Sequence, residues 1–382
     1  MTEAKQPPSP SLPALGLRGV FELLTMARWM GPWAGADARP RRVLREELLL
    51  DGPTPVRCFV YQIPGRTCTG VYVMAHGLHP LGPDHPEMDR FARLLAGSGN
   101  LVFVPFMEDY CRMELTREGG ESLGRAFRAA LDHPARPAHV KPGLFNVSLG
   151  SMSALRLAAS PEWRDKVGAI FSFGGFFSWD DTCWYAMTGE VGGERLVEPD
   201  LRSVPAVFKQ LRKALPCDER DRPVLAAAWL TYIRATWDPN GVHDAKEAAA
   251  MARKQAEQLP EHLRTLFLQG CAAEPGYAEL FRDRHHLDDT ALYELREDVA
   301  HIRCPVFLVH GALDNVIHHT EMDRLAEHLD PSTPRAMNRT GLRSHTVGAK
   351  SGGGLGYMIG EIRTMLRILR GMHAASRQRS VG

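Results

Sequence analysis

The chain has 382 residues, enough for one large domain or two ordinary ones. Hydrophobic residues make up 44% and charged residues 24%, which is the balance of a globular protein and not of a disordered one. The formal net charge is +1 and the sequence has no long run of Lys or Arg. A nucleic-acid-binding protein would carry a basic surface, so no nucleic-acid partner is expected.

The seven cysteines are scattered, odd in number and never spaced as a CxxC pair. This pattern favours reduced thiols over a disulfide framework, and we expect a cytoplasmic location. Neighbouring histidines occur at His285-His286 and at His318-His319. Adjacent residues on a helix point in different directions, and no Cys or carboxylate spacing completes either pair, so no metal site is expected.

The N-terminal region gives two open interpretations. Residues 1–13 are rich in Pro and Ser and lack the basic start and apolar stretch of a secretion signal. Residues 14–34 have apolar positions at helical spacing, but two Arg and one Glu make the segment too polar to span a bilayer. The segment either docks on the main domain as a helix or makes peripheral membrane contact, with Trp29 and Trp33 at the interface.

The first half of the chain predicts alternating strands and helices. Strand-like runs at 44–50 and 56–61, separated by Asp51-Gly52-Pro53, predict an antiparallel hairpin. From residue 71 onward, nearly continuous apolar runs alternate with amphipathic segments, which is typical of βαβ units and a parallel sheet. Strands are predicted at 71–75, 101–104, 144–147 and 167–173, and helices at 87–96, 121–131 and 150–159.

The alternation stops at Phe176, and only helix-like segments follow for more than a hundred residues. The predicted fold is therefore α/β, a mostly parallel central sheet flanked by helices, with a helical lid inserted after the sixth strand. Such an insertion would cover the carboxyl ends of the strands, where ligands bind in parallel sheets. Helices are predicted at 206–215, 224–236, 245–258, 262–269 and 291–299, then a strand at 305–309, a helix at 321–328, a strand at 336–339 and a helix at 356–371. The expected organisation is an N-terminal extension at 1–42, a core at 43–175 and 301–372, a cap at 176–300 and a frayed polar tail at 373–382.

A strand-to-helix turn contains the first candidate catalytic residue. Ser148 lies between the predicted strand 144–147 and the predicted helix 150–159, where a sharp turn exposes a serine hydroxyl. Small residues two positions away let strand and helix approach each other. Gly150 meets that demand, whereas Asn146 replaces the usual Gly on the strand side. Asn tolerates positive backbone dihedrals, so the turn can form with it. An ordinary serine that caps the helix is the alternative interpretation.

Two backbone N–H groups are candidates for an oxyanion hole. His76-Gly77 begins the loop after the predicted strand 71–75, and the next N–H is that of Leu78. The second donor would be the N–H of Leu149, directly after the candidate nucleophile. His76 itself is expected to shape the loop and not to react.

A serine nucleophile needs a histidine as base and a carboxylate that orients this histidine, and the chain has a candidate for each after Ser148. Asp314 follows the buried strand 305–309 and could orient an imidazole, with Asp180 and Asp181 as weaker candidates. His345, in a loop beyond the last strand, is the candidate base. The chain order is therefore Ser148, Asp314, His345.

At these positions the chain resembles the α/β-hydrolase superfamily, in its lidded esterase, lipase and lysophospholipase-like branch. The resemblance is carried by His76–Pro105, Asn146–Ala154, Cys304–Leu329 and the loop around His345. It implies that Ser148, Asp314 and His345 form a catalytic triad, with Leu78 and Leu149 at the oxyanion positions. The N-terminal forty residues and most of the helical insertion match nothing in that family.

The resemblance implies a serine hydrolase that cleaves a carboxylic ester through an acyl-enzyme, acting on a small or lipid-like ester. An acyltransferase, a thioesterase or amidase, and a non-catalytic ligand-binding relative remain open alternatives. No organic cofactor is expected, because the Gly-rich run at 351–354 lacks the strand–helix context of a dinucleotide site. Aromatic residues at the start of the insertion either line a pocket for an apolar acyl group or attach the insertion to the core. The pocket candidates are Phe176, Phe177, Trp179 and Trp184.

Overall fold

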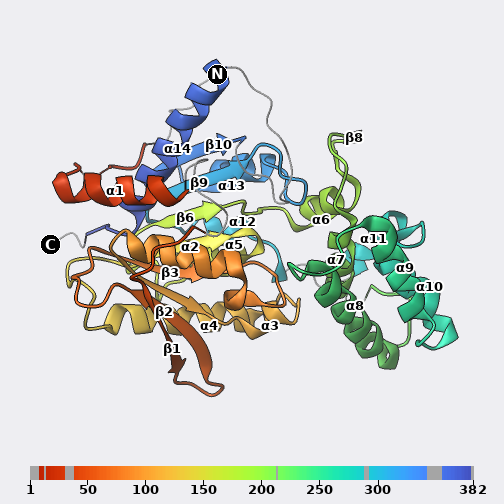
Figure 1. Ribbon diagram of the computed structural model, residues 1–382. Helices are drawn as coiled ribbons and strands as arrows, with labels where there is room; N and C mark the ends of the chain where they lie inside the picture. Colours follow the sequence, from red (N-terminus) through yellow and green to blue (C-terminus); the bar gives the residue numbers. More distant parts are fainter. Residues whose placement is uncertain are drawn as a thin grey trace.

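A single eight-stranded sheet forms the centre of the molecule (Figure 1). The computed structural model describes residues 8–12, 14–30, 38–211, 214–287, 292–341 and 355–379. The order of strands across the sheet is β1-β2-β4-β3-β5-β6-β9-β10. Their bounds are β1 Leu44–Leu50, β2 Val56–Gln62, β3 Gly70–Ala75, β4 Asn100–Pro105, β5 Gly143–Val147, β6 Ile170–Phe173, β9 Val306–Gly311 and β10 Arg335–Thr340.

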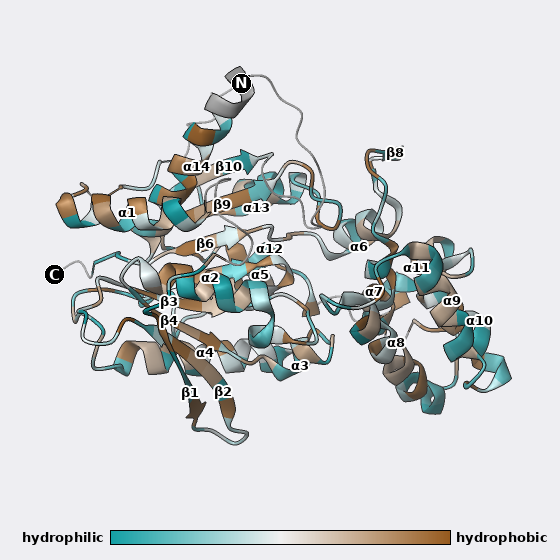
Figure 2. Cartoon of the chain, viewed as in Figure 1, coloured by the Kyte–Doolittle hydropathy of each residue, from teal (hydrophilic) through white to brown (hydrophobic). Residues whose placement is uncertain are grey.

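The sheet is mostly parallel, as expected. All neighbouring strands from β4 to β10 pair in parallel, whereas β2 runs antiparallel to both β1 and β4. The β1–β2 pair is the predicted hairpin. Because β3, β4 and β9 are buried on both faces, their sequences are mostly apolar, and Figure 2 shows them mostly in the hydrophobic colour.

Helices cover both faces of the sheet, and alternate residues of each strand contribute to two separate cores. Val71 and Val73 belong to one core, whereas Tyr72 and Met74 belong to the other. This double covering confirms the α/β class. The first core contains residues of α4 Arg117–Asp132, α5 Ser151–Ala159, α12 Arg296–Val299 and α13 Thr320–His328; the second contains residues of α1 Leu17–Met30, α2 Pro86–Gly97 and α14 Leu355–Ala375.

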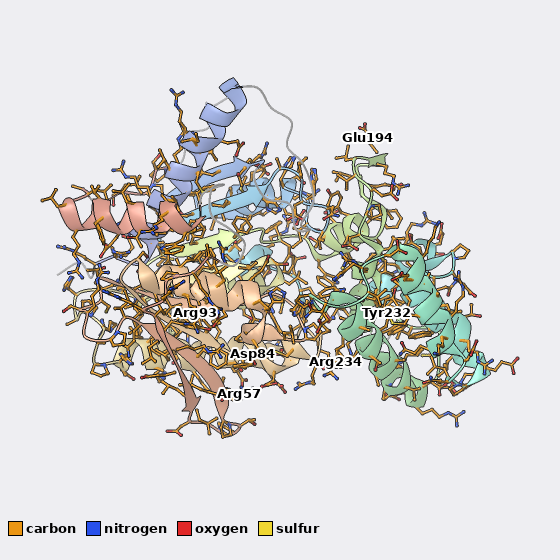
Figure 3. All side chains as sticks on the ribbon, viewed as in Figure 1. Arg57, Asp84, Arg93, Glu194, Tyr232 and Arg234 are labelled. Carbon is orange, nitrogen blue, oxygen red and sulfur yellow. The ribbon has the colours of Figure 1, made fainter. Side chains whose placement is uncertain are left out.

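Between β6 and β9 the chain leaves the sheet and forms a group of helices beside it (Figure 1). Figure 3 shows Tyr232 and Arg234 of this group well apart from Arg57 of β2 and Arg93 of α2. Two of its helices, α6 and α11, were not expected, nor was the small hairpin β7–β8. The elements of this group are α6 Trp179–Thr188, β7 Glu190–Val191, β8 Glu194–Arg195, α7 Val204–Gln210, α8 Arg222–Trp237, α9 Ala245–Ala256, α10 Glu261–Gly270 and α11 Tyr277–Arg284. The short helix α3, Glu108–Cys111, follows β4 and belongs to the sheet domain.

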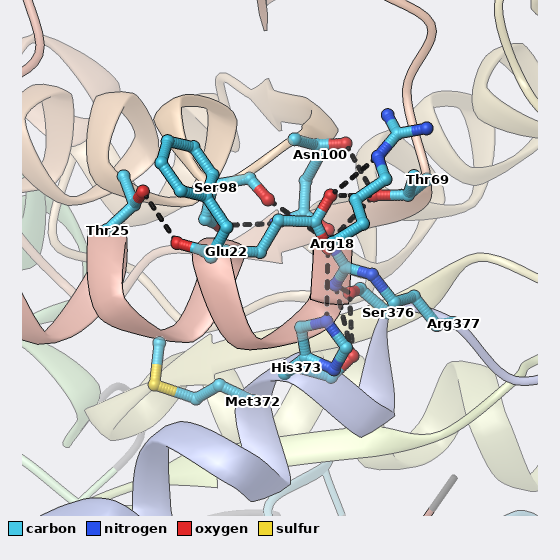
Figure 4. A network of polar contacts seen from close by, with 12 residues as sticks. Arg18, Glu22, Thr25, Thr69, Ser98, Asn100, Met372, His373, Ser376 and Arg377 are labelled. Atoms are coloured by element: carbon cyan, nitrogen blue, oxygen red, sulfur yellow. Dashed lines mark hydrogen bonds and ion pairs between the residues drawn. The ribbon is translucent and has the colours of Figure 1, made fainter. Parts of the chain in front are cut away.

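The N-terminal helix α1 docks on the sheet domain through a buried carboxylate (Figure 4). One oxygen of Glu22 accepts hydrogen bonds from Thr69 Oγ1 at 2.9 Å and Arg18 Nε at 3.3 Å. The other lies 3.1 Å from both His373 Nε2 and Arg377 Nη2. Burial alone would raise the pKa of Glu22, but the contacts with His373, Arg377 and Thr69 outweigh it and lower the pKa to about 2.

Glu22→Gln is expected to lower the free energy of unfolding by about 3 kcal/mol, because it leaves the buried Arg377 without its counter-charge. The folded-state pKa lies below the ordinary value of 4.5, so the stabilisation is complete above about pH 4.5 and is lost as the pH falls toward 2. Urea titrations from pH 3 to 7 measure both effects. The matched control is Glu47→Gln, which removes an exposed pair with Arg57. If the two variants lose the same free energy of unfolding, the stabilising role of the buried Glu22 is contradicted.

The C-terminal segment differs from the frayed tail that the sequence predicts. Helix α14 continues to Ala375, and the backbone beyond it is bonded to the amino-terminal side of the sheet. The carbonyl of Ser376 accepts from Val71 N–H and that of Gln378 accepts from Lys141 N–H, each at 2.9 Å. Polar composition hid this docking, because backbone groups make the contacts. None of the helices in the described ranges is long and apolar enough to cross a membrane.

Candidate active site

The candidate residues lie at the carboxyl ends of three strands. His76-Gly77 follows β3, Ser148 follows β5, and Asp314 lies three residues beyond the end of β9. In the sheet, β3 is the neighbour of β5, and β9 lies two strands away with β6 between them. Strands are about 4.8 Å apart, so the ends of β5 and β9 are about 10 Å apart, which leaves room for an imidazole between a serine and a carboxylate.

Ser148 lies on a strained turn. It is one of three non-glycine residues in the described ranges with a positive φ, here +52°. The turn leads from β5 through a single 3-10 turn, Ser148–Gly150, into α5. A left-handed conformation costs a non-glycine residue about 1–3 kcal/mol and is retained where the surrounding structure requires it, often at functional sites. Here it presents the serine side chain at the sheet edge, and the side chain is half-buried.

Gly150 allows α5 to pass close to β3. A Cβ at this position would lie 2.5 Å from the carbonyl oxygen of Ala75 and 2.6 Å from that of His76. Backbone atoms cannot move aside as a flexible side chain can. A residue without a side chain is therefore needed at position 150, because these two carbonyl oxygens occupy the space that a Cβ would fill.

Gly150→Ala is expected to destabilise the fold by about 1–3 kcal/mol and to move Ser148 out of position, because the new methyl group would overlap with two carbonyl oxygens. Thermal unfolding measures the loss of stability, and the rate at which a serine-reactive probe labels Ser148 measures the change in its position. Gly120→Ala is the matched control, since a Cβ there meets nothing within 4 Å and Ala favours the helix. A Gly150→Ala variant that is as stable and as quickly labelled at Ser148 as the Gly120→Ala variant would contradict the proposed turn geometry.

Asn146, where the family has a small residue, lies inside β5 and not in a left-handed turn. It pairs with Ala75 on one side and Ser172 on the other, and its Nδ2 donates to Ser172 Oγ at 2.8 Å. Its tolerance for positive φ is therefore not the reason that it fits, and that part of the expectation is wrong. The side chain fits beside Ser172, its small neighbour on β6, which accepts its hydrogen bond.

The loop after β3 is fixed by His76. The Nε2 of this buried ring accepts a hydrogen bond from Met107 N–H at 3.2 Å, so the proton is on Nδ1, which lies 2.7 Å from the carbonyl oxygen of Gly77. Burial lowers the pKa of His76 to about 4, so the ring is neutral near pH 7. Because the Gly77–Leu78 peptide is trans, its N–H points away from the oxygen that His76 holds.

The two candidate oxyanion donors lie beside Ser148. A Cβ on Gly77 would lie 3.2 Å from Ser148 Cβ and 3.6 Å from Ser148 Oγ, so the loop touches the serine directly. Within the described part of the chain, the N–H groups of Leu78 and Leu149 donate no hydrogen bond. Leu149 N–H is at the start of a helical turn, where N–H groups have no partner within the helix.

Asp314 is buried and is held by the backbone. Its Oδ1 accepts hydrogen bonds from Val316 N–H and Ile317 N–H, both at 2.9 Å. Its Oδ2 lies 3.7 Å from Nε2 of the buried His310. The hydroxyl of Tyr185 donates to the carbonyl oxygen of Asp314 at 2.7 Å. These contacts fix the carboxylate at the end of β9.

The remaining expected residues are less well placed or not described. His345 lies outside the described residues. Asp180 and Asp181 are on the first turn of α6, where Asp180 lies 3.5 Å from His285 Nε2 and Asp181 pairs with Arg324. No three His, Cys, Asp or Glu side chains gather as a metal site among the residues that the structure describes.

The four aromatic pocket candidates are at the junction of the insertion and the core. Phe176 and Phe177 are buried, and the ring of Phe177 lies 4.4 Å from a histidine ring of α13. Trp179 stacks on Tyr293 at 4.4 Å, and Trp184 is half-buried. Phe177 joins the start of the insertion to α13, and Trp179 packs within the insertion. The role of the four residues in an acyl pocket stays a prediction.

Three helices of the insertion reach the loops at the candidate site. Tyr185 of α6 bonds to Asp314, as described above. Gln210 of α7 bonds to backbone groups of the loop that follows α3. At the end of α8, the carbonyl oxygen of Trp237 lies 3.3 Å from His79 Nε2 in the loop after β3. Tyr185 and Gln210 could not be recognised from the sequence, because their partners are distant in the chain.

The strand order, the left-handed serine after β5 and the buried carboxylate after β9 together decide the fold. The chain has the α/β-hydrolase fold. No family model matches it, and no curated protein matches it either.

Several solved structures are similar to this α/β-hydrolase chain. Acylaminoacyl peptidase from Pyrococcus horikoshii is 13% identical; the match covers 89% of this chain and 42% of the peptidase, with a TM-score of 0.47. Dienelactone hydrolase from Anabaena variabilis is 14% identical over 87% of this chain and 97% of its own, with a TM-score of 0.43. Est1E from Butyrivibrio proteoclasticus is 11% identical over 85% and 98%, with a TM-score of 0.44. This chain spans less than half of the peptidase, and these likenesses are too distant to carry an argument about activity.

Proposed function

We propose that the protein is a serine hydrolase that cleaves a carboxylic ester with an apolar acyl group. The observation that carries this proposal is the left-handed backbone of Ser148, with φ +52°, on the turn between β5 and α5. A helix-capping serine needs no such strain, because a capping residue adopts an extended backbone. A nucleophile that must be exposed above the sheet does need it.

In the proposed mechanism His345 removes the proton of Ser148 as Oγ attacks the ester carbonyl carbon. The N–H groups of Leu78 and Leu149 stabilise the negative charge on the carbonyl oxygen. The intermediate collapses to an acyl-enzyme, and the alcohol leaves with the proton from His345. Water then attacks the acyl-enzyme with His345 as base, the acid is released and Ser148 regains its proton. Asp314 orients the imidazole and stabilises its cation.

The described histidines near the site support the choice of His345 by their own contacts. Both ring nitrogens of His76 are engaged in fixing the loop. His318 Nδ1 contacts Thr320 Oγ1 at 2.8 Å, and burial together with the neighbouring His319 lowers the pKa of His318 to about 4. A ring with so low a pKa is a weak base at neutral pH.

An apolar acyl group is supported by the side chains at the sheet edge. Leu78 is buried and Leu149 is half-buried beside Ser148, and the insertion contacts the loops around them. We propose that α6, α7 and α8 act as the lid of this site. Closure by a lid excludes water and strengthens the interactions that stabilise the oxyanion.

A series of p-nitrophenyl esters from acetate to decanoate tests this proposal. The value of kcat/KM is expected to rise with chain length by up to about fourfold per methylene, until the pocket is full. The Ser148→Ala variant gives the background rate. A steady fall in kcat/KM from acetate onward would contradict the apolar acyl pocket. Faster cleavage of matched thioesters, or acyl transfer to an added alcohol, would replace ester hydrolysis by one of the alternative reactions.

A further inference from the structure

Helix α1 presents an apolar stripe to solvent although its opposite side is docked. Leu17, Val20, Phe21 and Leu24 follow the spacing i, i+3, i+4, i+7 and are 94%, 42%, 61% and 64% exposed. The other side of the helix contributes the buried Glu22 network, which fixes its rotation. The helix therefore cannot turn its apolar stripe inward without breaking this network.

Helix α14, which contacts α1 through His373 and Glu22, adds exposed apolar and basic residues. Ile362 is 46% exposed and Leu366 is 57% exposed. Arg363, Arg367 and Arg370 are exposed as well, at the spacing i, i+4, i+7. Figure 1 shows the first turns of α14 extending beyond the sheet, at the end of this helix that is farther from α1.

The exposed charges on the two helices are all positive. Glu22 and Glu361 are the acidic residues of α1 and α14. Glu22 is buried in its network, and Glu361 accepts a hydrogen bond from Thr340 Oγ1 at 2.9 Å. Exposed apolar side chains and exposed arginines on neighbouring helices are the features of a surface that binds anionic lipid.

We propose that the apolar stripe of α1, together with the arginines of α14, docks the protein on an anionic lipid bilayer. This inference goes beyond the proposed function and does not depend on it. Glu22 binds Thr69 directly before β3, at the amino edge of the sheet, whereas Ser148 lies at the carboxyl edge. Helix α14 runs from the carboxyl edge, where Glu361 accepts from Thr340 at the end of β10, back to α1 at His373, so its arginines lie between the two edges.

Sedimentation of the full chain with vesicles tests the proposal. We expect binding to phosphatidylcholine vesicles that contain phosphatidylserine and much weaker binding to phosphatidylcholine alone. Replacing three residues of the α1 stripe with serine, as Leu17→Ser/Phe21→Ser/Leu24→Ser, is expected to lower the partition coefficient between vesicle and water about a hundredfold or more. The reason is that three apolar side chains no longer insert into the bilayer. Leu49→Ser/Leu196→Ser, which changes leucines that are 65% and 46% exposed elsewhere, is the matched control and should bind as the wild type does.

Replacing the three exposed arginines of α14 with glutamine, as Arg363→Gln/Arg367→Gln/Arg370→Gln, is expected to lower the partition coefficient on anionic vesicles roughly fivefold for each arginine. Turnover of a water-soluble ester should not change. If the wild type does not bind the vesicles that contain phosphatidylserine, the proposal is overturned. Equal binding by the wild type and the α1 triple variant would overturn it too. A wild-type dimer in analytical ultracentrifugation that the α1 variant dissociates would make a second copy of the chain the occupant, which also contradicts the proposal.

Discussion

Replacing Ser148 with alanine is expected to lower kcat for ester hydrolysis by about 10⁵-fold or more, because the reaction loses its nucleophile. The fold should not change, because alanine and serine have the same Cβ at the left-handed position and only the half-buried hydroxyl is lost. Steady-state turnover of a p-nitrophenyl ester measures the effect, with thermal unfolding as the check on the fold.

Ser160→Ala is the matched control for this loss. Ser160 ends α5, and its hydroxyl donates only to the nearby carbonyl of Leu157, so its removal should leave turnover within about twofold. A purified Ser148→Ala enzyme that keeps wild-type turnover would show that the serine at the turn is not the nucleophile.

Asp314→Asn is expected to lower kcat by about 10⁴-fold without unfolding the protein. The amide oxygen of Asn can still accept the hydrogen bonds from Val316 N–H and Ile317 N–H, so the loop geometry is kept. What is lost is the negative charge that selects the imidazole tautomer and stabilises its cation. Rate measurements at saturating ester, alongside thermal unfolding, separate this loss of catalysis from a loss of stability.

Asp180→Asn and Asp181→Asn are the matched controls, because these residues are the competing acids in the sequence. Each has a partner of its own, His285 or Arg324, outside the loop after β9. Both variants are expected to keep kcat within a few-fold of the wild type. A large loss in either of them, with a normal rate for Asp314→Asn, would move the acid to α6.

The parallel strands were predictable because burial on both faces makes their sequences continuously apolar. The runs at β3, β4, β5 and β9 matched the structure to within two residues. The predicted strand at 167–173 is shorter, because β6 begins at Ile170. Gly168, within that run, lies against the backbone of Lys141, where a Cβ would be 2.6 Å from its carbonyl oxygen. Such close packing is a tertiary effect that hydropathy does not report.

The unexpected elements have weaker signals. Helix α6 begins after Ser178, whose hydroxyl accepts from Asp181 N–H at 3.4 Å, so a capping signal was present but was masked by the aromatic run around it. The strands β7 and β8 have two residues each, too few for any periodic pattern. Gly192 and Gly193, with φ of +61° and +85°, form their turn and were the only local sign of a hairpin.

Within the site, the sequence could predict residue types and chain order but not contacts. It pointed to Ser148, Asp314 and the loop of His76, since each comes within three residues of the end of an apolar strand. It could not reveal that Asn146 reaches Ser172 across the sheet, because strand neighbours are set by topology. The contact of Tyr185 with Asp314 is distant in sequence for the same reason.

Labelling with a fluorophosphonate probe, followed by peptide mapping, tests the central claim most directly. The probe phosphonylates a serine only where a base activates its hydroxyl and an oxyanion hole receives the developing charge. The account predicts covalent modification of Ser148 in the folded protein, and none in the Ser148→Ala variant. Modification of a different residue, or no modification of a protein shown to be folded, would contradict an activated serine at this turn.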